Sequence, residues 1–129
     1  MTGKAVLALS LSVAGGTLAA QHGTVQSLLS KDLAGVPSRE VSMITVEYPP
    51  GGSTPAHTHH AQALLYVVEG SIVMQVKGGT PITLEPGQTW YEAPDDVHIV
   101  SRNASQTAPA KYVVFMVKDK GAPILTPVK

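Results

Sequence analysis

Apolar residues recur in short runs from residue 39 onward, separated by polar and turn-forming clusters. The runs are rich in Val, Ile, Tyr and Thr, which favour strands, and each has the length of a strand rather than of a helix. They predict strands over residues 41–48, 64–68, 71–77, 82–85, 89–92, 97–101 and 111–117.

The clusters between these runs contain the residues that turns require. They include Pro49 to Gly52, Gly78 to Pro81, Pro86-Gly87 and Pro94 to Asp96. Proline presets φ, glycine supplies positive φ, and aspartate bonds its own backbone, so each cluster marks a reversal of the chain. Short strands at regular spacing with such turns indicate an all-β fold, an antiparallel sandwich or barrel.

The first twenty residues have a different pattern. Lys4 precedes an apolar run over residues 5–14, glycines follow at 15 and 16, and small residues occupy 17–20. This order is typical of an export signal, so we expect residues 1–20 to be removed and the protein to be periplasmic or secreted. The alternative is a retained helix in a cytoplasmic protein. The run is shorter than the ~20 residues of a membrane span, which argues against a stable membrane anchor.

The remaining length and composition limit the function. After a mixed lead-in at 21–38, which could hold one helical turn or an edge strand, residues 39–129 are enough for one domain. Nine basic and nine acidic side chains give zero formal net charge, so no nucleic-acid surface is indicated. The absence of Cys from the sequence excludes disulfides and thiolate ligands, leaving His, carboxylate, amide or water to bind a metal.

Four of the five histidines lie in two places. His57, His59 and His60 follow the first Pro/Gly turn, and His98 follows the Pro-Asp-Asp turn. In an extended segment His57 and His59 project from the same face, because side chains alternate with period two, whereas His60 projects from the other face. His98 could complete a set of three imidazoles that leaves open positions on a metal. His22, alone, is read as an ordinary surface histidine.

The first of these places resembles a known family motif. Residues 51–70, GGSTPAHTHHAQALLYVVEG, are similar to the first cupin motif, G-x5-H-x-H-x3-E-x6-G, with Gly51, His57, His59 and Gly70 at matching positions. The resemblance implies a jelly-roll barrel of the double-stranded β-helix type, and it implies that these two histidines bind metal.

The second place resembles the second cupin motif, G-x5-P-x-G-x2-H-x3-N. In residues 87–103, GQTWYEAPDDVHIVSRN, Gly87 and His98 keep the family separation. Pro94 and Asn103 are each displaced by one position, and Asp96 stands where glycine is usual. Together the motifs and their flanking strands extend the resemblance over roughly residues 39–117.

The main departure is at the carboxylate ligand of the first motif, where this chain has Ala63. A degenerate cupin without metal is one interpretation; a three-histidine centre, as in some cupin dioxygenases, is the other. Gln62 and Glu92 are the candidates for an additional ligand or for a group that supports the ligands. Without a carboxylate, we expect the gap beside Ala63 to hold water or a substrate oxygen.

Four further side chains are candidates for the lining of the pocket. Trp90 and Tyr91 could lie at the barrel mouth, Tyr66 lies on a motif strand, and Arg102 could contact an anion. The alternative is plain strand packing for the aromatic residues and solvation for the arginine.

These observations lead to two hypotheses of function. In the first, His57, His59 and His98 hold one divalent ion (Fe, Mn, Ni, Cu or Zn) that binds a small oxygenated organic molecule, as in a dioxygenase-type oxidoreductase. The only candidates for a general base are His60, Glu92 and Tyr91. In the second, the same pocket binds a metal or small ligand without turnover. We also expect a homodimer, formed through strand 41–48 or the lead-in.

Overall fold

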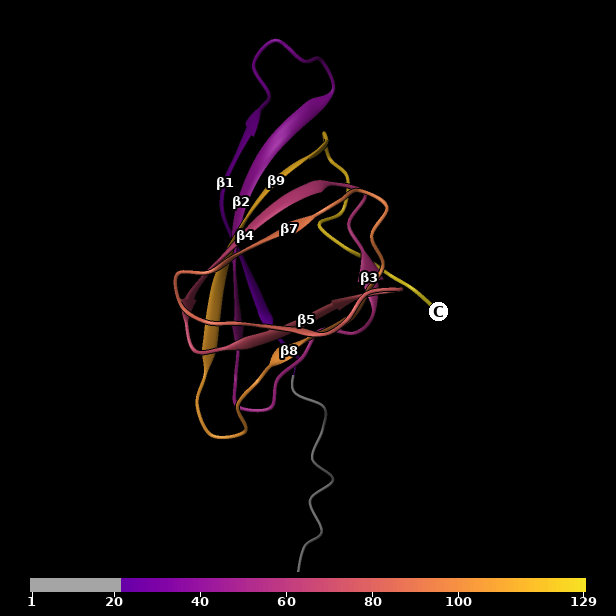
Figure 1. The fold of residues 1–129 in the computed structure, drawn as a ribbon. Helices are drawn as coiled ribbons and strands as arrows, with labels where there is room; N and C mark the ends of the chain where they lie inside the picture. The colour runs from indigo at the N-terminus through magenta and orange to yellow at the C-terminus, as the bar shows by residue number, and fades with distance from the viewer. Residues whose placement is uncertain (1–21) are drawn as a thin grey trace, which may run out of the picture.

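The computed structural model describes residues 22–129, which form ten β-strands and, within that range, no helix (Figure 1). The all-β antiparallel architecture expected from the sequence is confirmed. The strands are β1 (Thr24–Asp32), β2 (Arg39–Tyr48), β3 (His57–Thr58), β4 (Gln62–Glu69), β5 (Ile72–Val76), β6 (Ile82–Leu84), β7 (Thr89–Glu92), β8 (His98–Asn103), β9 (Ala110–Asp119) and β10 (Thr126–Pro127).

One sheet carries the long strands, in the order β1-β2-β9-β4-β7. Burial alternates along β4 and β9, so that one side chain of each pair points into the barrel and the next points outward. The inward side chains of β2, β4 and β9 form most of the core, including Ile44, Leu65, Val67, Val114 and Met116. In the sequence β4 and β9 are continuous apolar runs, so burial alternates with period two although apolar character does not.

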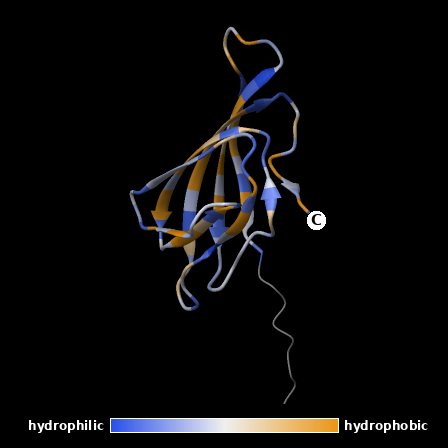
Figure 2. Cartoon of the chain, turned by 45° about the vertical axis from the view of Figure 1, so that its right-hand side comes forward, coloured by the Kyte–Doolittle hydropathy of each residue, from blue (hydrophilic) through white to orange (hydrophobic). Residues whose placement is uncertain are grey.

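The second sheet carries shorter strands, in the order β10-β3-β8-β5-β6. It closes the other side of the barrel and adds Ile72, Met74 and Leu84 to the core. Figure 2 shows apolar segments along the strands and polar segments in many of the connecting loops. The two sheets therefore enclose one interior, into which residues of both motifs can project.

Buried turns fix the ends of the motif strands. Asn103 is 1% exposed, and its side-chain amide donates to the carbonyls of Pro49 and Ala108 at 3.1 and 2.7 Å. Gly70 has a φ of 68°, and a Cβ there would lie 2.4 Å from the carbonyl oxygen of Pro109. Only glycine avoids both the strain and the clash. The motif residues Asn103 and Gly70 therefore act in chain reversal rather than in chemistry.

The seven strands predicted from the sequence are present with small shifts at their ends. The lead-in forms an edge strand, β1, antiparallel to β2. Strand β2 lies between β1 and β9, so its backbone edge is not free for another copy, and the expectation that it could cross a dimer interface as an open edge is wrong. The short strands β3 and β10 were not predicted, because two residues carry too little pattern.

The expected export signal at residues 1–20 lies outside the described residues. Among the residues that are described, none belongs to a helix with the length and apolar character of a membrane span.

Candidate metal centre

Four side chains from the two motifs converge inside one end of the barrel. His57 lies in β3 and is the cross-strand partner of His98, the first residue of β8. His59 follows β3 in the loop, and Glu92 is the last residue of β7 in the other sheet. His57, Glu92 and His98 are buried, at 5%, 3% and 1% exposed. The site therefore bridges the two sheets, at a point where strand ends meet.

The imidazole rings pack against one another. The centroid of the His57 ring lies 4.7 Å from that of His59 and 5.1 Å from that of His98. His59 and His98 are 5.0 Å apart by the same measure. The expectation that His57 and His59 share a face came from strand parity, but β3 ends at Thr58 and the chain turns at His60, whose φ is 51°. The loop nonetheless returns His59 toward His57.

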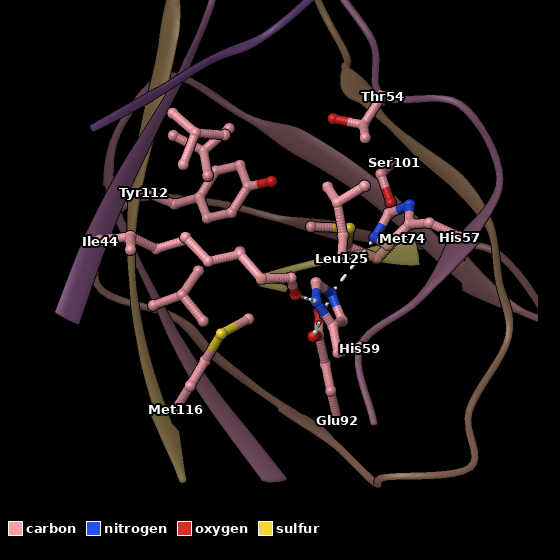
Figure 3. Close-up of a pocket in the computed structure, with 14 residues that line it drawn as sticks. Ile44, Thr54, His57, His59, Met74, Glu92, Ser101, Tyr112, Met116 and Leu125 are labelled. Atoms are coloured by element: carbon pink, nitrogen blue, oxygen red, sulfur yellow. Dashed lines mark hydrogen bonds and ion pairs between the residues drawn. The ribbon is translucent and has the colours of Figure 1, made fainter. Parts of the chain in front are cut away.

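The donor atoms of His59, Glu92 and His98 all lie within 4.8 Å of one another. Glu92 Oε2 is 3.2 Å from His59 Nε2 and 3.6 Å from His98 Nε2. His57 Nε2 is 3.2 Å from His59 Nε2 (Figure 3). Two ligands bound at about 2.0–2.1 Å with tetrahedral or octahedral angles lie roughly 2.8–3.4 Å apart. The spacing of these atoms is thus close to that of neighbouring metal ligands.

Hydrogen bonds to the outer ring nitrogens leave Nε2 of two histidines available. His57 Nδ1 donates to the carbonyl of Pro55, and His59 Nδ1 donates to the carbonyl of Ile124, each at 2.7 Å. In the neutral rings Nε2 then carries a lone pair. Two lone pairs that face each other at 3.2 Å repel unless a cation or a proton lies between them. A metal ion would relieve this repulsion.

His98 gives the second indication that the residues fit a metal. Both of its ring nitrogens are buried without a hydrogen-bond partner among the described residues, and the same holds for Glu92 Oε2. Buried polar atoms are nearly always satisfied, so an unpartnered imidazole calls for a ligand. Nitrogen and carboxylate donors suit the first-row divalent ions. His59, Glu92 and His98, with His57 beside them, are the residues that would hold one.

Burial and the carboxylate set the charges of the site. Burial lowers the pKa of His57 and of His98, so both rings favour the neutral form that binds metal. Burial also opposes charge on His59, but the carboxylate of Glu92 outweighs it and raises the His59 pKa. Burial alone would raise the pKa of Glu92; the neighbouring histidines, His59 first, lower it instead. Glu92 therefore supplies one buried negative charge.

The position of Glu92 changes the interpretation of Ala63. Ala63 is fully buried and is the cross-strand partner of Glu92, so both side chains project into the barrel from adjacent strands. The gap expected beside Ala63 thus faces a carboxylate that reaches the histidines from β7. A negative charge is present at the site after all, but it comes from the neighbouring strand.

A small cavity adjoins these residues. It has about 30 Å³ of room for the centres of water-sized molecules, enough for about two waters. Its polar wall contains His57, His59, Glu92, Thr54, Ser101 and Tyr112. Tyr112 belongs to a chain of hydroxyls in which Tyr48 contacts Thr54 at 2.6 Å and Tyr112 at 3.1 Å. Burial raises the pKa of Tyr112 well above its ordinary value, so the phenol stays protonated and can donate a hydrogen bond.

The other residues singled out from the sequence lie away from the cavity. Gln62 is exposed, and its amide donates to the hydroxyl of Tyr91 at 3.2 Å. Tyr66 and Tyr91 are 51% and 52% exposed on the outer face, as their strand parity dictates. Arg102 is exposed between the inward-facing Ser101 and Asn103. These four side chains are not among the residues that line the cavity.

Trp90 and His60 do not line the cavity either. Trp90 is half-buried and packs against the core cluster, with its indole N–H lacking a partner among the described residues, but it does not line the cavity. His60 is exposed, as expected, and its ring lies 3.4 Å from the hydroxyl of Thr58. Of the three candidate general bases, only Glu92 faces the cavity.

Several cavity residues were missed from the sequence. Tyr112 carries a signal that could have found it, because it sits at an inward position of a strand whose burial alternates. Ser101 carries none, since it lies three residues after His98 and only the register shift between β5 and β8 turns both side chains inward. Ile124 and Leu125 carry none, since nothing in the C-terminal residues indicates that the chain returns to the metal centre.

Comparison with known proteins identifies the family of this chain. Residues 44–116 match the family model described as the cupin domain. A curated relative, germin-like protein subfamily 1 member 7 of Arabidopsis thaliana, is 32% identical over 65 residues, which is 50% of this chain and 28% of the relative. The chain thus spans little more than a quarter of the length of that relative.

Solved structures resemble the fold. An uncharacterised double-stranded β-helix protein from Klebsiella pneumoniae superposes with a TM-score of 0.65 at 18% identity, covering 84% of this chain and 85% of that one. An oxalate oxidase in complex with the substrate analogue glycolate gives a TM-score of 0.63 at 24% identity, covering 95% and 63%. At these identities the likeness shows the fold alone.

Proposed function

This chain belongs to the cupin domain family, and from that membership we propose that it is a metal-binding protein that takes up a small oxygenated organic ligand for dioxygenase-type oxidation. The observation that carries the proposal is the convergence of the donor atoms of His59, Glu92 and His98 within 4.8 Å of one another. Nothing else in the described interior explains why three histidines and a carboxylate are buried together without full hydrogen bonding.

In this proposal the chain's own residues hold the ion, orient the imidazole rings and contact the organic ligand. His59, Glu92 and His98 would hold the ion, with His57 as a fourth donor, and the carbonyls of Pro55 and Ile124 orient two of the rings. The ion, when bound, supplies Lewis acidity or one-electron chemistry. Tyr112 can donate a hydrogen bond to a ligand oxygen from the opposite wall, and the apolar side chains exclude bulk water (Figure 3).

The ion is Fe, Mn, Ni, Cu or Zn, all of which accept imidazole and carboxylate ligands. The proposed ligand is an enol, a phenol or a carboxylate, because oxygen atoms that bind such an ion also accept from a tyrosine hydroxyl. The oxalate oxidase with glycolate bound is a structural neighbour that handles a ligand of this type, at an identity that supports only the fold.

The test is to measure the metal content of the purified protein and then its dioxygen consumption with small diketones and phenols. Stoichiometric metal together with substrate-dependent oxygen uptake supports the proposal. His98→Ala should strongly lower both the metal content and the oxygen uptake, and His60→Ala, which alters an exposed histidine, should lower neither. Absence of metal after reconstitution with each of the five ions would overturn it.

A second function, binding without turnover, is favoured by one observation. Of the candidate bases only Glu92 faces the cavity. It lies close enough to the histidines to bind the same ion, and a carboxylate that binds the ion is not free to act as a base. The same experiment distinguishes the two functions, because a metal-loaded protein that binds a diketone without consuming oxygen would be a binding protein.

We also propose that the mature protein is exported and forms a homodimer. Every residue of the edge strand β1 is exposed, including Leu28 and Leu29, and such edges are usually covered. A purified protein whose N-terminus is Gln21 supports export, and one that retains Met1 contradicts it. A monomer mass from light scattering at micromolar concentration would contradict the proposed homodimer.

A further inference from the structure

The residues after β9 return to the metal centre. Ala122 N–H donates to the carbonyl of Asp119 at 3.1 Å, which turns the chain, and β10 then pairs with β3. Val128 N–H donates to the carbonyl of Ala56 at 3.1 Å. Figure 1 shows this stretch, in yellow, running beside β3. We call residues 122–129 the closing segment.

The closing segment forms part of the cavity wall. Ile124 and Leu125 line the cavity, and Ile124 also packs against the core. The carbonyl of Ile124 accepts the hydrogen bond from His59 Nδ1 at 2.7 Å, although the two residues are 65 positions apart in sequence. One short stretch therefore contacts both the space beside the histidines and one of the histidines itself.

The size of the cavity means that a wall has to move. Room for about two waters cannot admit an organic molecule of even a few heavy atoms. The wall formed by β2 and β9 belongs to a ladder ten residues long. The closing segment is held by a two-residue ladder, and Thr126, Pro127 and Val128 are exposed. It is the wall whose displacement breaks the fewest interactions.

We propose that the closing segment is a displaceable wall of the metal centre, in which Leu125 and Ile124 set the size of the ligand and the Ile124 carbonyl positions His59. The proposal rests on the function proposed above for its ligand. Its contact with His59 is independent of that function, because it is a hydrogen bond between two parts of the protein itself.

The hydrogen bond links admission of the ligand to the orientation of His59. While the segment is seated, the Nδ1–H of His59 is tied to Ile124 and Nε2 faces Glu92. When the segment leaves, the ring loses this restraint and can rotate or change tautomer. Ile124 is thus a positioning residue that acts through its backbone, and Leu125 is a determinant of ligand size.

The first experiment measures the His59 ring in metal-free protein. Val128→Pro removes the backbone donor that seats the segment on Ala56, and Val128→Ala keeps that donor as the matched control. We expect the Nδ1–H proton of His59 to exchange slowly with water in wild type and Val128→Ala. In Val128→Pro its exchange should be at least about tenfold faster, since the acceptor is seated for less of the time. Equal protection in all three proteins would overturn the positioning role.

The second experiment measures ligand size with the cobalt-loaded protein. Acetate, butyrate and benzoate are titrated and followed by the visible absorption of Co²⁺. Leu125→Ala should raise the ratio of benzoate to acetate affinity about tenfold, because it removes apolar bulk from the wall. Ile82→Ala, on an exposed side chain of β6, should leave the ratio unchanged. An unchanged ratio in Leu125→Ala would overturn the role in size selection.

The two experiments also distinguish the failure of this proposal from the failure of the proposed function. A wild type that binds neither cobalt nor any of the five proposed ions overturns the metal function, and the exchange of the His59 proton still decides whether the closing segment positions the ring. If the wild type binds cobalt, but Val128→Pro leaves the exchange of the His59 proton unchanged and Leu125→Ala leaves the ligand ratio unchanged, the metal function stands. The proposed role of the closing segment is then overturned.

Discussion

Two buried charged side chains face the interior from the same sheet, and their surroundings differ. Lys118 in β9 is 4% exposed; its ammonium group donates to the carboxylate of Glu40 and, at 2.7 Å, to the carbonyl of Ala122. Glu92 in β7 is 3% exposed and lies against histidines, one of which has both ring nitrogens without partners among the described residues. The protein itself supplies hydrogen-bond partners for Lys118 and Glu40, whereas the histidines beside Glu92 lack some of theirs.

The difference separates a structural role from a functional one. Burial of charge is tolerated when donors and acceptors match, as around Lys118, where the pair joins β2 to β9 and holds the base of the closing segment. At the histidines the same burial leaves both ring nitrogens of His98 without a partner among the described residues, which has no structural benefit. This shortage of partners is the feature that fits a metal ion.

The largest effect is expected from removing His98. His98→Ala should weaken binding of Zn²⁺ or Mn²⁺ by about 100-fold or more, because it takes away a buried donor from the set. The metal-free protein should not melt at a lower temperature by more than a few degrees, since no hydrogen bond among the described residues is lost. Calorimetric titration and thermal melting measure the two quantities. A large loss of stability without loss of affinity would make His98 structural, like Lys118.

The next effect tests the placement of the carboxylate. Glu92→Ala should weaken metal binding by roughly 10–100-fold. Adding Ala63→Glu to that variant should restore most of the affinity, because positions 63 and 92 face each other across β4 and β7. Titration of the same ion into the single and double variants measures this. If the double variant binds no better than Glu92→Ala, the two positions are not equivalent.

A smaller effect is expected at the satisfied pair. Lys118→Met should lower the melting temperature by on the order of 5–10 °C, because the Glu40 carboxylate loses its buried partner. It should leave the metal affinity of the histidines unchanged. Lys120→Met is the matched control, since Lys120 pairs with Asp32 at the surface, where such pairs contribute little. A change in metal affinity in Lys118→Met would show that the two regions are coupled.

The smallest effect concerns pH. The hydrogen bond from Lys118 lowers the pKa of Glu40 below its value in the unfolded chain. The stability that Glu40 contributes is therefore fully present above the unfolded pKa, near 4.5, and is lost as the pH falls through the lower folded value. The difference in melting temperature between wild type and Glu40→Gln should be largest near neutral pH and should shrink below about pH 4.5. A difference that grows with acid would reverse the sign of this argument.

Much of the fold could be predicted because strands leave a local pattern. The seven predicted strands are short runs rich in Val, Ile, Tyr and Thr between explicit turns, so their composition and length show them within a few residues. Glu92 could be suspected as well, because it is the acidic residue of β7 and shares the inward parity of Trp90. Tyr66 and Tyr91 have the opposite parity to Ala63 and Glu92, and their strands turn them outward. Arg102 has the parity of His98, but the register shift between β5 and β8 turns it outward, and no local pattern reveals that shift.

The sequence by itself determined the all-β architecture, the histidines of the two motifs and the absence of a carboxylate at Ala63, since each is readable from spacing within a short window. Only the tertiary structure decided that Glu92 faces Ala63 across β4 and β7 and that Ile124 bonds to His59. Both contacts join residues far apart in the chain. Their geometry depends on strand register and on the path of the closing segment, and no local periodicity encodes either.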